Sequence, residues 1–299
     1  MKDNFKDLLK QFRADNNLSQ NDFVDLFLSS GNSLSKLDTV TLSRWENGKT
    51  VPSIAKKITI MRTLNLLVSY IYSIHGFDIP TKINSSLNTR FGIEYERYRK
   101  LNKPIITNHI KFEHTDQRDK IQPHIKEYLI SETMDMINII PPSSLSIGRW
   151  FSDDKTEAFF IHAFANSSIY GENGKDGVNS IIMFEQVTSS RFYYKLCTLC
   201  LFNAILNNQH LDYFFIHVNT KYFFKLALSF GCDVVTTINE LSAPSNEDMN
   251  LKHTNILKIE IDKLLSNKDF LFFCLQSRID IKAVSPQSLE EIDRIYKSI

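Results

Sequence analysis

The chain has 299 residues, of which 42% are hydrophobic and 23% are charged, and this composition excludes an intrinsically disordered protein. No run of about 18 apolar residues occurs, so we expect no transmembrane helix and no membrane partner. Four cysteines are too few for a disulfide framework, and the start, MKDNFKDLLKQF, lacks a signal-peptide core. We therefore expect a cytoplasmic protein.

Charge is unevenly distributed behind a formal net charge of +1. Residues 1–130 carry 20 Lys and Arg against 14 Asp and Glu, whereas residues 131–299 carry 15 against 20. The basic front part allows a polyanionic partner, and the acidic remainder is a poor candidate for wrapping DNA. At roughly 150 residues per domain, the length predicts about two domains.

The pattern over residues 4–75 predicts an all-α domain of short helices. Apolar residues recur every three or four positions from Phe5 to Phe12, from Phe23 to Phe27 and from Ile54 to Leu64. A further helix is predicted over 65–74. The polar, turn-rich stretch that follows marks a junction, so we divide the chain into a domain at 1–75 and a connector at 76–104.

The segment LSQNDFVDLF…TVTLSRWENGKTVPS resembles the helix-turn-helix family of the lambdoid phage repressors and Cro, also called the XRE type. Ser19-Gln20 opens the second helix, and TVTLSRWENGK (39–49) matches the recognition helix and the loop after it. Arg13 stands where the family places the arginine that pairs with Glu46 of the ENG triplet. The chain departs from the family in a longer connection, SSGNSLSKLD (29–38), between the two helices of the motif.

The resemblance implies a domain that binds a double-stranded DNA operator, and a single motif reads so few base pairs that we expect a homodimer. The early residues of a recognition helix lie at base edges, where Arg44 can pair bidentately with guanine. A helix N-terminus and the loop after the recognition helix can hold phosphates. We expect eight residues to contact DNA: Gln20, Thr39, Val40, Thr41, Arg44, Asn47, Gly48 and Lys49. Leu42 and Trp45 point inward, and Arg44 and Lys49 have the alternative of being ordinary surface cations.

From residue 105 the pattern alternates between β-rich and helical runs. It predicts strands at 105–113, 145–151, 157–165, 180–187, 212–218, 233–239 and 255–264. It predicts helices at 116–130, 191–208, 221–231 and 285–298, the third of them ending at Gly231 as a C-cap. The predicted fold class is therefore α+β, an all-α domain followed by one mixed sheet with helices.

This order resembles the GNAT acyltransferase fold, and the tail from 213 to 264 looks most like the N-acyl amino acid and acyl-homoserine lactone synthases. The Ser190-Arg191-Phe192 triplet is similar to the one that opens their central helix. The resemblance implies a GNAT-like domain at 105–283 and a closing helix at 284–299. It also implies that two adjacent strands splay to admit an acyl donor, so the ligand expected is an acyl group or acyl-CoA.

The departures from that family weigh against catalysis. The loop QVTSSRFYY (186–194) contains no glycine, and bulky side chains there block close approach to a pyrophosphate. Thr188 replaces a glutamate, and Phe223-Phe224 replaces the Phe-Tyr pair that supplies a candidate general acid. We therefore assign no catalytic residue. The residues that we expect to bind the ligand are Phe184, Ser190, Arg191, Phe215 and His217, with the alternative that the phenylalanines simply fill the core.

We expect no metal site. Cys197 and Cys200 form a C-x-x-C inside an apolar helical run rather than at a helix N-terminus, so core packing is the prediction. Cys232 and Cys274 lack the spacing of a second zinc-binding pair. His162 and His217 lie on strands among aromatic residues, where core histidines are the expectation and general bases the alternative.

Three functions follow. The leading hypothesis is a sequence-specific DNA-binding transcription regulator whose GNAT-like domain senses a small acyl ligand or mediates dimerisation. The alternative is an active acyltransferase or N-acyl signal synthase with an autoregulatory DNA-binding domain. The third is a phage-type repressor or antitoxin whose second half only dimerises or holds a protein partner.

Overall fold

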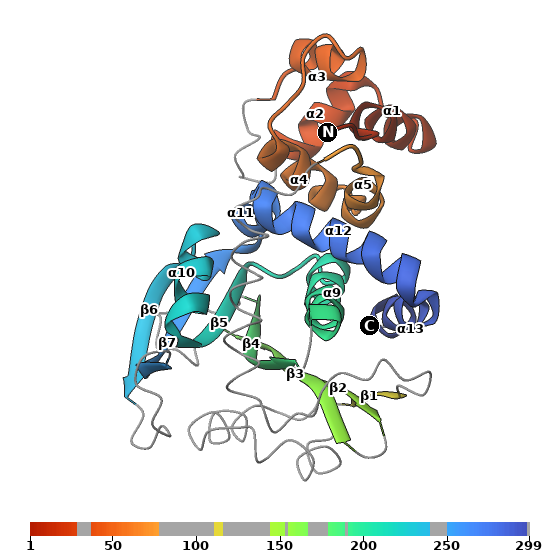
Figure 1. Cartoon of the computed structure of the whole chain (residues 1–299). Coiled ribbons are helices and arrows are strands. Elements are labelled where there is room, and N and C mark those ends of the chain that lie inside the picture. Colours follow the sequence, from red (N-terminus) through yellow and green to blue (C-terminus); the bar gives the residue numbers. More distant parts are fainter. Residues whose placement is uncertain are drawn as a thin grey trace. The chain divides into compact units, whose positions relative to one another are not determined.

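The computed structural model describes residues 1–28, 37–77, 111–115, 144–152, 155–166, 179–188, 191–239 and 250–297. The chain divides into two compact units, Met1–Asp78 and Ile79–Ile299. The first is helical, and the second combines helices with a mixed sheet (Figure 1). The predicted α+β class is therefore confirmed.

The first unit contains five helices among its described residues: α1 (Phe5–Asp15), α2 (Gln20–Leu28), α3 (Thr39–Glu46), α4 (Ile54–Thr63) and α5 (Leu67–Ser73). Three of them begin at capping side chains: Asp38 accepts a hydrogen bond from Thr41 N at 2.6 Å, Ser53 accepts one from Lys56 N at 3.3 Å, and Ser19 accepts one from Asp22 N at 3.2 Å. Trp45 is buried, as predicted. Most of the long connection between α2 and α3 lies outside the described residues.

The residues before α1 hold the helices of this unit together. Lys2 and His75 exchange backbone hydrogen bonds of 2.8 and 3.0 Å, which joins the two ends of the unit. Asp3 forms an ion pair of 2.7 Å with the buried Lys57 of α4. Because Asp3 also accepts from the hydroxyl of Tyr70, the start of the chain is fixed to both α4 and α5.

The second unit contains a seven-stranded sheet in the order β1-β2-β3-β4-β5-β7-β6. Its strands are β1 (Lys111–Thr115), β2 (Leu145–Ser152), β3 (Lys155–Asn166), β4 (Asn179–Thr188), β5 (Tyr213–Thr220), β6 (Asp233–Asn239) and β7 (Asn250–Glu260). Neighbouring strands are antiparallel except β4 and β5, which are parallel. A parallel pair needs a crossover, and α9 (Arg191–Asn207) supplies it.

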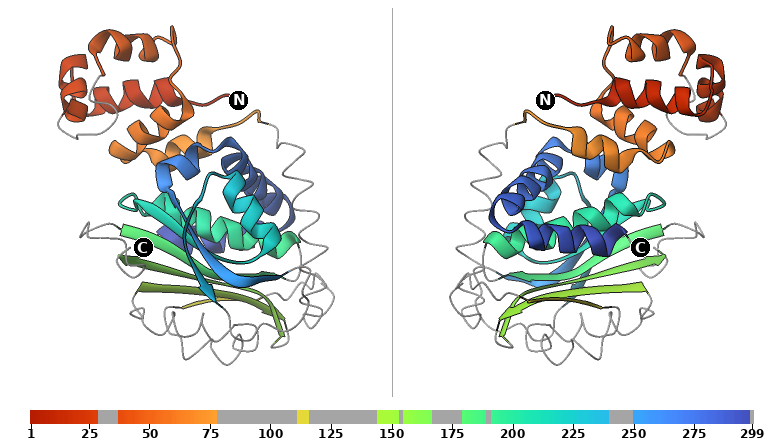
Figure 2. Two further views of the ribbon diagram at one scale, coloured as in Figure 1. Left: turned by 90° about the vertical axis from the view of Figure 1, so that its left-hand side faces the viewer. Right: turned by 90° about the vertical axis from the view of Figure 1, so that its right-hand side faces the viewer.

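Four further helices accompany α9: α10 (Lys221–Ser229), α11 (Ile261–Ser266), α12 (Lys268–Val284) and α13 (Pro286–Lys297). Both views of Figure 2 show α9 to α13 on one face of the sheet. α9 packs on β3 and β4, and α10 packs on β5 and β7. The closing helix α13 packs against α9 and α12. The sequence predicted α9, α10 and α13 close to their observed bounds.

Two predictions about the last third of the chain were wrong. The strand predicted over 255–264 ends at Glu260, and Ile261–Ser266 is a helix whose buried residues Ile261, Leu264 and Leu265 have helical spacing. The 17-residue helix α12 was not predicted at all. Its residues Phe270 to Leu275 are all buried, so this run shows no polar face from which a helical period can be read.

Other predicted elements shift or fall outside the description. The strand predicted over 105–113 is described only from Lys111, and it continues to Thr115. The helix predicted over 116–130 lies outside the described residues. Gly231 is confirmed as the cap of α10: it has a φ of +90°, and Cys232 N donates to Ala227 O at 3.2 Å. In the described part of the chain, no helix has the length and hydropathy that crossing a bilayer requires.

Candidate functional site

A buried ion pair joins α1 to α3 in the first unit. Arg13 Nε and Nη2 donate to the two carboxylate oxygens of Glu46 at 2.6 and 3.1 Å, and Arg13 Nη1 donates to Leu18 O at 2.7 Å. Gln20 Nε2 donates to Glu46 Oε2 at 2.7 Å. The Glu46 side chain is only 4% exposed, so these donors satisfy a buried charge and hold three helices at fixed angles.

The outward side of α3 carries the residues that were predicted to contact DNA. Val40 is 57% exposed and Arg44 is exposed, while Leu42 and Trp45 on the inward side are buried. The spacing from Val40 through Arg44 to Asn47 places these three on one stripe of the helix and its cap. Thr39 and Thr41 are half-buried, and the exposed Gly48 and Lys49 follow in the loop.

The Gln20 side chain, which was predicted to hold a phosphate from the start of α2, donates one amide hydrogen to Glu46 Oε2 inside the unit. An amide nitrogen carries two hydrogens, so the phosphate contact stays a prediction. Gly48 has a φ of +66°, which explains why a glycine follows α3.

In the second unit, strands β4 and β5 pair over only part of their length. Their parallel ladder runs from Ser180 and Tyr213 to Met183 and Ile216. Beyond that point β4 continues against β3 to Thr188, and β5 continues against β7. Among the described strands nothing pairs with the facing edges of β4 and β5 there. The sheet therefore opens between two strands whose backbone groups face each other without forming a ladder.

A β-bulge lies where the opening begins. Ile161 pairs with Glu185 and His162 pairs with Met183, so Phe184 is the extra residue on β4. A bulge bends a strand and locally disrupts its ladder. The bend at Phe184 is therefore the backbone feature that turns β4 away from β5.

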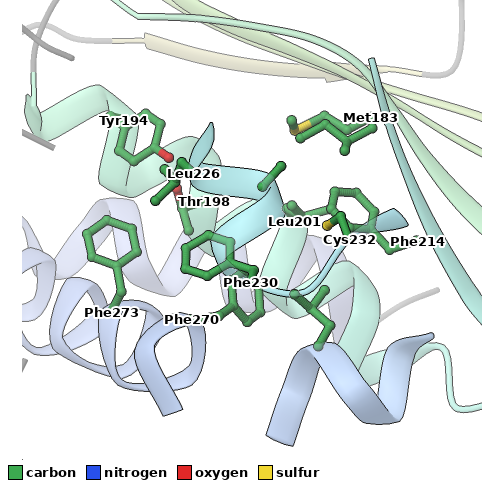
Figure 3. Close-up of a pocket in the computed structure, with 13 residues that line it drawn as sticks. Met183, Tyr194, Thr198, Leu201, Phe214, Leu226, Phe230, Cys232, Phe270 and Phe273 are labelled. Atoms are coloured by element: carbon green, nitrogen blue, oxygen red, sulfur yellow. The ribbon is translucent and has the colours of Figure 1, made fainter. Parts of the chain in front are cut away.

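An apolar pocket lies beside the last pair of this ladder, between the sheet and its helices (Figure 3). The cavity has a volume of about 50 Å³. Its lining residues come from two strands, four helices and the turn after α10: Met183, Tyr194, Thr198, Leu201, Phe214, Ile216, Leu226, Ala227, Phe230, Cys232, Leu264, Phe270 and Phe273.

The lining of the pocket is apolar and contains few polar side chains. Its polar lining side chains are Tyr194, Thr198 and Cys232, and none of the thirteen lining residues carries an ordinary charge. Burial raises the pKa of the Cys232 thiol to about 12, so it is not a nucleophilic thiolate at neutral pH. α10 contributes Leu226 and Ala227, neither of which is an acid or a base.

Two of the predicted ligand residues lie on the far side of the sheet from this pocket. Phe214 and Ile216 line it, so the alternating residues Phe215 and His217 point to the other face. Both are buried. Burial lowers the pKa of His217 to about 4, so this imidazole is neutral at pH 7.

The remaining predicted ligand residues are described by backbone only or not at all. Phe184 forms the bulge and Arg191 begins α9, and their side chains lie outside the described part of the structure. Ser190 lies outside the described residues. Sequence reasoning missed Tyr194, Thr198 and the walls from α11 and α12, because residues brought together from so many elements leave no local pattern.

The C-x-x-C pair behaves as predicted. Cys197 and Cys200 are fully buried, and burial raises the pKa of the Cys200 thiol well above its ordinary value. His162 is also fully buried and stacks on Phe160, with 4.5 Å between the ring centroids. Among the described residues, no group of three or more His, Cys, Asp or Glu is placed to hold a metal ion.

No family model matches the sequence, and no curated protein matches it. Among solved structures, the N-acyl amino acid synthase from uncultured soil microbes is similar over 54% of this chain and 96% of its own, with 13% identity and a TM-score of 0.37. The ribosomal-protein-S18-alanine N-acetyltransferase of Escherichia coli is similar over 51% and 94%, with 13% identity and a TM-score of 0.34. An acetyltransferase of Bacillus subtilis, solved with CoA, is similar over 51% and 99%, with 8% identity and a TM-score of 0.34.

Proposed function

We propose that the sheet unit binds an acyl thioester between β4 and β5 and transfers its acyl group to an acceptor. The observation that carries the proposal is the opening beyond Met183 and Ile216, with an apolar pocket beside it. The opening and the pocket favour a ligand with two chemically different parts, one that hydrogen-bonds to a strand edge and one that is apolar.

The free strand edge favours a ligand with amide groups. An extended ligand can add to an exposed edge through main-chain hydrogen bonds, as peptides do in β-augmentation. The facing edges beyond Met183 and Ile216 have this character. The pocket favours an apolar group, because its lining is almost entirely aliphatic and aromatic. A pantetheine arm carries two amides and ends in a thioester to an acyl chain, so an acyl-pantetheine satisfies both parts.

His217 supports transfer rather than binding alone. In the proposed step an acceptor amine attacks the thioester carbonyl, the carbon–sulfur bond breaks, the thiol leaves and the amine loses a proton. His217 follows Ile216 on β5, directly past the last ladder pair and on the face opposite the pocket. At a pKa near 4 the buried ring is neutral at pH 7 but only weakly basic, so its proposed role rests on its position: the ring accepts a hydrogen bond from the attacking amine, and the leaving thiolate takes the proton.

The test separates binding from turnover. Purified full-length protein is incubated with acyl-CoA and a panel of amino acids and amines, and free thiol is measured alongside equilibrium binding of the acyl-CoA. We expect thiol release with at least one acceptor, and we expect His217→Gln to lose release while it retains binding. Binding with no release from any acceptor supports a sensor instead, and absence of binding overturns the proposal.

We propose a second function for the first unit, the binding of duplex DNA. The specific observation is the exposed stripe of Val40, Arg44 and Asn47 on a helix whose inward side is held by the Arg13–Glu46 pair. A rigid helix with an exposed apolar residue and an arginine can contact a thymine methyl and a guanine in the major groove.

To test this second function, DNA duplexes that bind the protein are selected from a random pool. The affinity of the protein for the selected sequence is then measured by fluorescence anisotropy. We expect a defined half-site and binding that weakens as salt is raised. If acyl-CoA changes this affinity, the chain is a regulator whose ligand binds the DNA-competent and incompetent states unequally. A pool that yields no preferred sequence contradicts specific DNA reading.

A further inference from the structure

The pocket of the sheet unit has a wall that does not belong to the sheet or to its crossover helices. Leu264 of α11 and Phe270 and Phe273 of α12 complete it. Figure 3 shows Met183 on the side of the sheet and Phe270 on the opposite side of the cavity. A chain that enters beside β4 therefore points toward the ring of Phe270.

Neighbouring rings hold Phe270 in place. Its ring meets Phe230 edge-on with 5.8 Å between centroids, and it meets Phe202 edge-on with 6.2 Å between centroids. Both arrangements have the T-shaped geometry that aromatic pairs favour. Phe270 therefore cannot rotate aside without displacing two other rings.

The backbone on each side of this wall is fixed as well. Asn267 caps α12 by accepting from Phe270 N at 3.0 Å, and its amide donates to Phe230 O at 3.3 Å. This one side chain thus joins the start of α12 to the end of α10. A wall fixed in this way does not yield to a longer ligand, because inserting extra methylenes into a packed interior forces strained rotamers and backbone shifts.

From this geometry we propose that Phe270 sets the maximum length of the acyl chain that the pocket accepts. The inference rests on the proposed acyl-thioester binding and names its substrate class, short-chain acyl groups. A cavity of about 50 Å³ has room for only a few water-sized groups, because one such group needs roughly 10–15 Å³. The ring of Phe270 therefore stands where a medium or long chain has to continue.

The test is a series of binding measurements with straight-chain acyl-CoA from acetyl to tetradecanoyl, using the full chain. We expect the affinity of the wild-type protein to rise over the short chains and then to fall by at least tenfold at a definite length. Phe270→Ala should keep the affinity for short chains, and its affinity should fall only at chains at least two carbons longer than in the wild type. In Phe270→Trp the affinity should fall at a shorter chain length than in the wild type.

Phe272 provides a matched control, since it is a buried phenylalanine on the same helix that does not line the pocket. Phe272→Ala should leave unchanged the acyl-chain length at which the affinity falls. If Phe270→Ala does not fold, Phe270→Leu should give a smaller shift in the same direction. If the affinity falls at the same acyl-chain length in every Phe270 variant, the inference is overturned and the proposed acyl binding is not. Affinities that do not depend on chain length in the wild type overturn the inference together with the proposed function.

Discussion

The two units of this chain present their candidate sites in different ways. The surface of the first unit comes from one continuous stretch, Thr39–Lys49, and lies on the outside of a helix. The pocket of the second unit takes residues from Met183 to Phe273 and lies inside the fold. A site on one helix can be recognised from its spacing, whereas a site between many elements exists only after the chain has folded.

The largest expected effect comes from removing the Arg13–Glu46 ion pair, which holds the inward side of α3. Arg13→Ala leaves the carboxylate of Glu46 buried without its main partner. We expect the first unit to lose about 3 kcal/mol of unfolding free energy, because an unpaired buried charge is costly. Thermal or urea unfolding of the first unit, compared between the variant and the wild type, measures this loss.

Arg44→Ala is the control for that experiment, since Arg44 lies exposed on the same helix. Its removal should change the stability of the unit by no more than about 0.5 kcal/mol. Equal losses in the two arginine variants contradict the structural role assigned to Arg13.

The burial of His217 in the second unit predicts a pH dependence of the free energy of unfolding. The pKa of His217 is lowered from 6.5 to about 4 by burial, so the unfolded chain binds more protons between these pH values. The free energy of unfolding therefore falls as the pH falls through this window, by about 3 kcal/mol in total. His217→Gln should remove this part of the pH dependence, and denaturant titrations from pH 7 to pH 4 measure the difference.

The exposed His210 in the same unit provides the comparison. His210→Gln should keep the pH dependence of the wild-type protein. A His217→Gln variant with that same dependence contradicts the burial of a neutral imidazole.

The helical surface makes a smaller and more selective prediction about DNA. Arg44→Ala should weaken binding to a selected duplex by roughly 1–3 kcal/mol and relax the preference at one base pair. Lys49→Ala should weaken binding to all sequences alike and reduce the salt dependence. Footprints and affinities that both variants share with the wild type contradict the proposal that α3 binds in the major groove.

The smallest expected effects test whether the units unfold independently. Gly231 and Gly48 both have positive φ values, of +90° and +66°, and each lies in a different unit. Replacing either with alanine should cost about 1–2 kcal/mol, because a side chain disfavours this backbone region. Calorimetry should show Gly231→Ala lowering only the transition of the second unit and Gly48→Ala only that of the first. One shared transition shifted by both variants contradicts separate units.

Much of the first unit could be predicted because its signals are local. The apolar spacing predicted four of the five helices, and the resemblance to the helix-turn-helix family supplied α3 and the pairing of Arg13 with Glu46 that the structure contains. The bond from Gln20 to Glu46 was not predicted, because a sequence does not show which of several nearby partners an amide contacts.

In the second unit the sequence predicted strands well and the pocket poorly. The β-rich runs identified β2 to β6, but the last run was extended past Glu260 into a helix, and α12 was missed because its buried run has no polar face. Phe215 and His217 were predicted to bind the ligand, and the residues of β5 that line the observed pocket are Phe214 and Ile216. Choosing between the two faces of a sheet requires knowing which helices cover each one.

Isothermal titration of the full chain with butanoyl-CoA and with CoA tests the central claim most directly. The two ligands differ only in the short acyl group on the sulfur, so their affinity difference measures what the pocket contributes. Burying two or three methylene-sized groups at about 0.8 kcal/mol each predicts at least a tenfold tighter binding of butanoyl-CoA. Equal affinities for the two ligands, or no binding of either, contradict an acyl site between β4 and β5.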